Sequence, residues 1–202
     1  MKDFSRSLRR AAAGALILAA GCASLPDRVA QGVVNRWSAP SAAAARALID
    51  EYGLPDDATL NRLTWNRHGA WKRTVVWKRT VVWNQEPVYR SAADLAVMEQ
   101  TVDYPLTGEQ AARLLAFSDA LVVNLATGEL SSRAARETTD YLNLNLADEV
   151  ARGIRTPSQA RSRYARIEAL TAAGKSSPYT SGLLFIPAGG PGKGRRPGDT
   201  RS

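Results

Sequence analysis

Few side chains in this sequence could carry out chemistry. Its 202 residues include one histidine and one cysteine, which excludes a Cys/His zinc cluster and a disulfide within the chain. A Ser–His–Asp triad would need His68, yet no serine stands in a nucleophile-elbow motif. Because His68 lies between Arg67 and Gly69, we expect it in a turn at the surface, without a catalytic role.

Carboxylates are the other candidates, and adjacent acidic residues occur at Asp50-Glu51, Asp56-Asp57 and Asp148-Glu149. A glycosidase needs two carboxylates about 5–9 Å apart across a cleft. Neighbours on a helix or turn point apart, and the last pair precedes Arg152 as on a solvated helix face. A cell-wall hydrolase with paired carboxylates is therefore the alternative prediction, and a protein without catalytic activity is the preferred one. We expect no cofactor and no metal site.

The cysteine, Cys22, is the residue with the clearest predicted chemistry. Residues 1–10 carry four basic side chains, and residues 11–20 are uncharged and mostly apolar. Ten residues of helix span only about 15 Å, half a bilayer core, so residues 1–21 have the pattern of a secretory signal peptide. The following segment, Leu18-Ala19-Ala20-Gly21-Cys22, resembles the lipobox of bacterial lipoproteins, with Ala19 where leucine is most frequent.

The lipobox resemblance implies a membrane anchor. In such proteins the chain is cut before the cysteine, a diacylglycerol alkylates its thiol, and the new amine is usually acylated. Two or three acyl chains give a stable anchor, whereas one binds marginally. Ala23 and Ser24 follow Cys22, so the aspartate of the inner-membrane retention signal is absent and the resemblance implies the outer membrane, facing the periplasm. Arg9-Arg10 is expected to belong to an ordinary basic segment rather than a twin-arginine signal.

Residues 65–83 contain a hexapeptide duplication. The segment Trp71–Val76 is repeated without change as Trp77–Val82, and Trp83 begins a third copy. Because six is even, these tryptophans would share one face of a strand but scatter around a helix, and the Val, Thr and Trp content favours a strand. Thirteen extended residues would reach roughly 43 Å, so part of the strand is expected to project, bend or bulge.

One face of this strand is the candidate binding site for a sugar or peptide. It is predicted to carry Trp71, Arg73, Trp77, Arg79 and Trp83. The favoured alternative is a duplicated strand whose arginines stack on tryptophans at a solvated edge. A third possibility is a structural strand that pairs with another chain.

The remaining elements predict an α+β fold, with a small antiparallel sheet, a long Trp-rich strand, three or four helices and disordered termini. The signals for these elements are a helix from Ser41 to Gly53, a strand within 97–104, a capping box at Thr107 and Gln110, a short strand at 121–123, a helix from 133 to 152, and a last helix starting at Thr156-Pro157. The predicted organisation is a signal peptide (1–21), a tether (22–40), a single domain (41–172) and a flexible basic tail (173–202).

The formal net charge of +8 belongs mainly to the two ends of the chain. Residues 1–21 and residues 189–202 each hold four basic residues and one acidic residue, whereas residues 22–188 hold 19 basic and 17 acidic ones. A nearly balanced middle argues against a basic binding face, so no nucleic-acid partner is expected.

Part of the body, about residues 50–166, resembles a family of uncharacterised bacterial predicted lipoproteins. The resemblance lies in Trp71–Val76, in Glu99–Tyr104, in Gly128–Ser131 and in Asn143–Asp148. In that family the Trp-Lys-Arg-Thr-Val-Val segment occurs once, so the second copy departs from the pattern. The family has no established activity; the resemblance implies a location and a small α+β fold but no catalytic residue.

These features together predict a lipid-anchored envelope protein that acts by binding or scaffolding. Its expected partners are the membrane, through Cys22, and an envelope protein or the cell wall.

Overall fold

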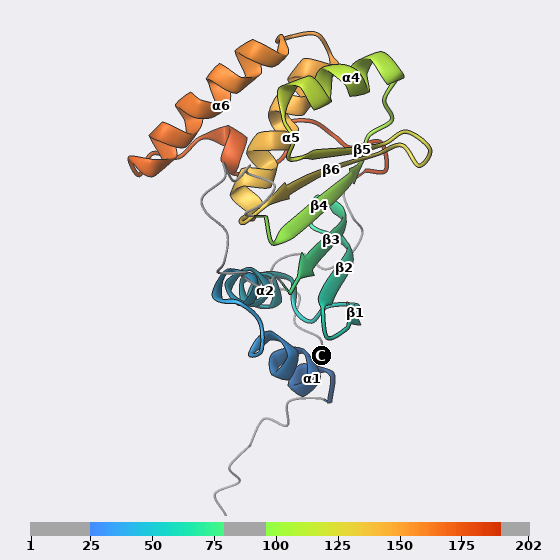
Figure 1. The fold of residues 1–202 in the computed structure, drawn as a ribbon, viewed down its shortest axis with the longest axis vertical. Helices are drawn as coiled ribbons and strands as arrows, with labels where there is room; N and C mark the ends of the chain where they lie inside the picture. Colours follow the sequence, from blue (N-terminus) through green and yellow to red (C-terminus); the bar gives the residue numbers. More distant parts are fainter. Residues whose placement is uncertain (1–24, 79–95, 191–202) are drawn as a thin grey trace, which may run out of the picture.

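The structure, a computed structural model, describes residues 25–78 and 96–190. Cys22, Arg79 and Trp83 therefore lie outside the described residues. The helices are α1 (Leu25–Val34), α2 (Ala39–Tyr52), α4 (Gly108–Phe117), α5 (Glu137–Ala151), α6 (Pro157–Ala172) and the 3-10 turn η1 (Pro178–Thr180). The strands are β1 (Asp57–Ala58), β2 (Arg62–His68), β3 (Trp71–Trp77), β4 (Met98–Asp103), β5 (Leu121–Asn124) and β6 (Glu129–Ala134) (Figure 1).

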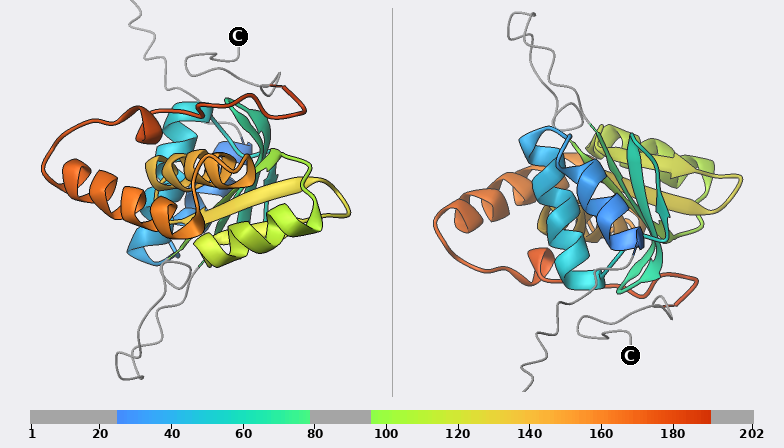
Figure 2. Two further views of the ribbon diagram at one scale, coloured as in Figure 1. Left: turned by 90° about the horizontal axis from the view of Figure 1, so that it is seen from above. Right: turned by 90° about the horizontal axis from the view of Figure 1, so that it is seen from below.

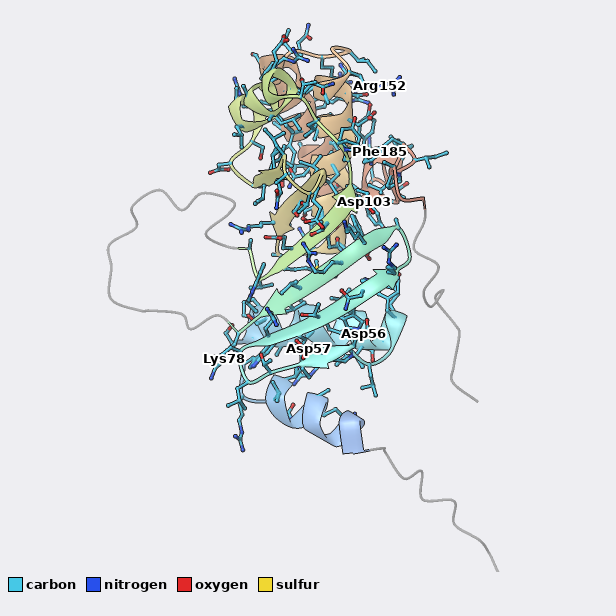
Figure 3. The ribbon with its side chains drawn as sticks, turned by 90° about the vertical axis from the view of Figure 1, so that its right-hand side faces the viewer. Asp56, Asp57, Lys78, Asp103, Arg152 and Phe185 are labelled. Atoms are coloured by element: carbon cyan, nitrogen blue, oxygen red, sulfur yellow. The ribbon has the colours of Figure 1, made fainter. Side chains whose placement is uncertain are left out.

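The described strands form one antiparallel sheet in the order β1-β2-β3-β4-β6-β5. Helices α1 and α2 lie side by side against one end of this sheet (Figure 2), and α5 packs against β4 and β6 at the other. In Figure 3 no described helix lies in front of β2, β3 and β4. The sheet therefore has one helix-covered face and one open face, and the predicted α+β class is confirmed.

The helix-covered face holds two apolar clusters. The first joins β4 and β6, through Val102 and Leu130, to α4, α5 and α6. The second joins β2, β3 and β4 to α2 and to the end of α1, around Leu63 and Val76. Between them the strand register places three fully buried polar residues side by side on β3, β4 and β6: Thr74, Gln100 and Ser132. These three residues are called the polar row below.

Local sequence signals predicted the helix starts well. Thr107 and Gln110 form the expected capping box at α4, and Thr156 forms a second one with Gln159 at α6. In both, the threonine hydroxyl accepts from a backbone N–H that the helix leaves unpaired. Gly53 ends α2 with a φ of 79°, a backbone conformation that favours glycine.

Four expectations about secondary structure were wrong. Residues 25–34 form α1 rather than a tether, because Ala30 and Val34 give the helix a buried apolar stripe. Ser41 is buried inside α2, and Ser38 is the N-cap. The helix expected from residue 133 begins at Glu137, because the preceding residues pair with β4 as β6.

The fourth concerns the tail expected from residue 173. Its first part belongs to the fold: Tyr179, Leu183 and Phe185 pack against the first apolar cluster. The Ala188 N–H donates to the Asp103 carbonyl at 2.9 Å. The apolar segment near residue 185 supplies enough buried surface to order a stretch rich in glycine and proline.

None of the helices within 25–78 and 96–190 is long and apolar enough to cross a bilayer.

Candidate functional site

The predicted Trp/Arg face is only partly present on the described strand. Trp71 is fully buried and stacks on Tyr141 of α5, with ring centroids 4.8 Å apart. Arg73 instead lies on the open face, where its guanidinium is 3.3 Å from Glu129. Trp77 is half-buried at the end of β3. Trp71 and Arg73 therefore do not share a face, which corrects the alternation expected from the sequence.

The reason lies in the start of β3. Arg67 and Gly69, just before it, both have positive φ angles, of 50° and 51°. Lys72 and Arg73 are neighbours in sequence, yet both reach Glu129. Two successive side chains on one side break the period of two that a regular strand would have. The first residue of the strand is thereby placed on the helix-covered face.

The charges on the open face are paired with each other. Lys72 lies 2.5 Å from Asp103 and 2.8 Å from Glu129, and Arg133 lies 2.7 Å from Glu99. The face is therefore polar and ordered but has no excess of either charge in these pairs. Asp103 is labelled on this side in Figure 3.

A second group of residues lies where the end of α2 meets the start of α5. We call it the Glu137 cluster; its members are Glu51, Tyr52, Trp71, Gln100, Glu137 and Tyr141. The Glu137 oxygen Oε1 accepts hydrogen bonds from the Trp71 indole at 2.5 Å, the Gln100 amide at 3.0 Å and the Tyr52 hydroxyl at 3.1 Å. Three donors from three elements fix this carboxylate firmly, and its place in the first turn of α5 also suits a negative charge.

The pKa values of Glu51, Tyr52 and Tyr141 in this cluster are all raised. Partial burial and the negative charge of Glu137 raise the pKa of Glu51 above its usual value, although a hydrogen bond from Tyr52 opposes this shift. Burial and the Glu137 charge also raise the pKa values of Tyr52 and Tyr141. The tyrosine hydroxyls of the cluster therefore stay neutral, and Glu51 and Glu137 are its two acidic groups.

The polar row continues the cluster into the core. The Thr74 hydroxyl lies 3.1 Å from His68 Nε2, and Asn143 of α5 donates to the Ser132 hydroxyl at 2.9 Å. His68 is only 3% exposed, so the expected surface position was wrong. Its burial follows from the edge-to-face contact with Tyr52, whose ring centroid is 4.6 Å away.

Some buried polar atoms along this row have no hydrogen-bond partner of normal geometry in the described structure: His68 Nδ1, Gln100 Oε1 and both carboxyl oxygens of Asp140. Asp140 is fully buried, and burial raises its pKa well above the usual range, although the Ser132 hydroxyl favours the charged form. Unsatisfied groups of this kind are rare in folded proteins. Their concentration beside one cluster marks this region as the strongest candidate site.

Two of the three adjacent acidic pairs nominated from the sequence have separate contacts for each member. Asp148 accepts from the Tyr104 hydroxyl at 2.7 Å and pairs with Arg152 at 3.2 Å. Glu149 instead accepts from the Tyr179 hydroxyl and pairs with Arg155. Asp57 pairs with Arg62, and Asp56 accepts the Asn66 N–H. The two members of each of these two pairs therefore have different partners.

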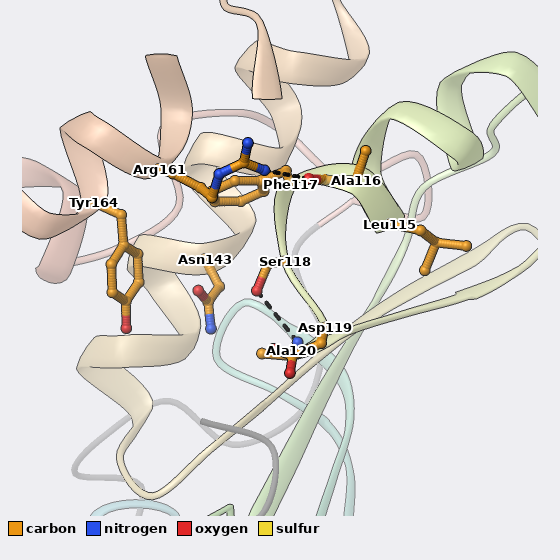
Figure 4. A pocket seen from close by; sticks show the side chains of 9 residues that line it. All are labelled: Leu115, Ala116, Phe117, Ser118, Asp119, Ala120, Asn143, Arg161 and Tyr164. Carbon is orange, nitrogen blue, oxygen red and sulfur yellow. Dashed lines mark hydrogen bonds between the residues drawn. The ribbon is translucent and has the colours of Figure 1, made fainter. Parts of the chain in front are cut away.

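A pocket of about 470 Å³ lies between α4, α5 and α6 (Figure 4). Three of its polar side chains already have partners: Arg161 donates to the Ala116 carbonyl, Ser118 accepts from the Ala120 N–H, and Tyr164 donates to Glu168. Because these three groups are already engaged and no buried polar atom of the lining lacks a partner, the pocket is a weaker candidate than the Glu137 cluster.

Sequence reasoning nominated Glu51 only as a neighbour of Asp50 and did not single out Gln100, Glu137 or Asp140 as candidate site residues. A signal for Asp140 exists: it lies three residues before Asn143 on a helix whose inner face is otherwise largely apolar. Nothing local marks Gln100 or Glu137, which are 37 positions apart and meet through the sheet.

No cluster of three or more His, Cys, Asp or Glu side chains arranged for a metal ion occurs among residues 25–78 and 96–190. Compared with protein-family models, curated proteins and solved structures, the chain matches none. A functional assignment must therefore come from its own residues and geometry.

Proposed function

We propose that this protein is a lipid-anchored component of the bacterial envelope that acts by binding a partner rather than by catalysis. The single observation that carries the proposal is the sole cysteine, Cys22, placed directly after a basic segment and a ten-residue uncharged run. Its location at the outer membrane, facing the periplasm, is part of the same proposal.

The position of the first helix is compatible with such an anchor. Helix α1 begins at Leu25, three residues after Cys22. Three residues span at most about 11 Å, so an acyl group on Cys22 would hold the folded domain close to the membrane surface. The domain would then bind its envelope partner close to the membrane surface.

The open sheet face supports binding as the mode of action. The strands β2, β3, β4 and β6 hold it rigid, and its ion pairs orient Lys72, Arg73 and Arg133. Rigid, oriented polar groups lose little conformational entropy when a partner binds. The alternative, a cell-wall hydrolase with adjacent carboxylates, is less well supported because Asp148 and Glu149 each have their own arginine.

The anchor is tested by labelling cells with a palmitate analogue and fractionating them. The wild-type protein should carry the label and sediment with the outer membrane, and Cys22→Ser should lose both properties. The proposal would be refuted if the wild-type protein carried no palmitate label. It would also be refuted if the Cys22→Ser protein stayed in the membrane fraction after removal of its signal peptide.

The binding face is tested by photocrosslinking in intact cells. A crosslinking amino acid at Asn66, which is exposed on the open face of β2, should capture a distinct partner, whereas one at the exposed Arg166 of α6 should not. Equal capture from both positions would argue against the sheet face. A wild-type protein that digests peptidoglycan would establish the hydrolase instead.

A further inference from the structure

The Glu137 cluster contains negative charge that no basic side chain balances. Within the described residues, the other half-buried carboxylates of the sheet and of α5 have a basic partner, as Glu99 has Arg133 and Glu129 has Lys72. Neither Glu51 nor Glu137 forms an ion pair with any described lysine, arginine or histidine. Two neighbouring carboxylates without a cation are costly unless something else compensates them.

Gln100 gives an independent indication that a ligand belongs there. Its side chain is fully buried, and its amide nitrogen donates a hydrogen bond to Glu137. Its carbonyl oxygen Oε1, bonded to the same carbon, is therefore also beside Glu137 and has no hydrogen-bond donor in the described structure. A buried acceptor that lacks a donor costs about 1–3 kcal/mol, so the site lacks an N–H or O–H group.

The cluster is rich in aromatic rings, which narrows the class of ligand. Tyr141 stacks on Trp71 and is itself half-exposed, and Tyr52, at the end of α2, donates its hydroxyl to Glu137. Carboxylates combined with aromatic rings recognise organic cations, because the ring faces attract positive charge. A divalent metal ion is usually held by several carboxylate or histidine side chains, and no group of three or more His, Cys, Asp or Glu side chains that could hold one occurs among the described residues.

We propose that the Glu137 cluster is a binding site for a primary ammonium group, held by the carboxylates of Glu51 and Glu137 and by the Gln100 carbonyl. The ammonium group has three N–H donors, which matches these three acceptor groups. Because Glu51 is exposed, the rest of the ligand extends into solvent. The site therefore binds only the cationic end of a larger molecule. This site lies on a different part of the protein from the open sheet face and requires neither the anchor nor that face.

Two sources could supply such a group: an amino sugar and the side-chain amine of a peptide. Titration of the purified full chain, carrying Cys22→Ser and monitored by tryptophan fluorescence and calorimetry, separates them. The probes are glucosamine and Nα-acetyl-lysine amide, each paired with its N-acetylated, uncharged analogue. Binding of at least one amine, with its analogue at least about tenfold weaker, is expected because acetylation removes both charge and two donors.

Variants then locate the binding. Glu51→Gln keeps size and exposure and should weaken amine binding about fivefold to tenfold. The matched control is Glu109→Gln on α4, whose carboxylate is 84% exposed and remote from the cluster; it should leave affinity unchanged. Glu137→Gln should weaken binding at least as much, and if it fails to fold, Glu51→Gln decides alone.

Three outcomes would overturn the inference: no binding of either amine at about 10 mM, equal binding of the acetylated analogues, or equal losses in Glu51→Gln and Glu109→Gln. Because the titration uses soluble protein, its failure is distinct from failure of the lipid anchor or of crosslinking at Asn66.

Discussion

Acidification should destabilise this protein partly through His68, and His68→Gln should remove that part. The imidazole is 3% exposed. Burial lowers the pKa of His68 from 6.5 to about 4, and the nearby Asp56 charge opposes the shift only in part. Gln was chosen because its amide can reach Thr74 as Nε2 does but does not titrate.

The sign and size follow from proton linkage. Because the folded-state pKa of His68 lies below the unfolded-state value, the unfolded chain binds more protons between pH 4 and pH 6.5. Stability is therefore lost as the pH falls through this window. The two pKa values correspond to a loss of about 2 kcal/mol between pH 7.5 and pH 5, and of about 3 kcal/mol by pH 4.

Urea unfolding followed by tryptophan fluorescence would measure this effect in a Cys22→Ser background, with and without His68→Gln. From about pH 7.5 to about pH 5, wild type should lose roughly 2 kcal/mol more than the variant. Asp140 titrates in both proteins and largely cancels in the comparison. A difference between the two proteins that stays constant over this range would show that the neutral imidazole is not buried as described.

Three further predictions concern stability. Asp140→Asn should stabilise the protein at neutral pH by about 1–3 kcal/mol in urea unfolding, and less near pH 4, because the buried carboxyl has a raised pKa and loses stability as the pH rises; a destabilised variant would contradict this. Trp71→Phe should cost about 2–4 kcal/mol, since it removes the indole donor to Glu137 and leaves a void, and a cost below 1 kcal/mol would argue against the contact. Deleting residues 77–82 moves Trp83 into the position of Trp77 and restores the sequence of β3, so thermal unfolding should shift by no more than about 2 °C; a larger drop would give the second copy a structural role.

The local parts of the fold could be predicted from the sequence because their causes are local. A threonine followed three residues later by glutamine is sufficient to start α4 and α6, and Gly53 is sufficient to end α2. The strand β6 could not be recognised, because Ser131, Ser132 and Arg133 lack strand propensity and are held by pairing with β4.

The candidate site was beyond local reasoning for a related cause. Glu51, Gln100 and Glu137 come from α2, β4 and α5, and only the packing of these elements brings them together. The hexapeptide repeat draws attention to Trp71, but the backbone turn before it decides which face of the sheet it occupies. The positive φ angle at Arg67 could not be predicted from the sequence, because arginine rarely adopts this backbone conformation.

The polar row also determines how the molecule can come apart. Packed apolar surfaces tolerate small sliding movements, whereas a hydrogen bond weakens steeply once its angle is lost. Thr74, Gln100 and Ser132 therefore separate the apolar cluster around Leu63 from the apolar cluster around Leu130. Each cluster can open locally without the other. The amide hydrogens should therefore exchange in two cooperative units, whose boundary runs across β3, β4 and β6.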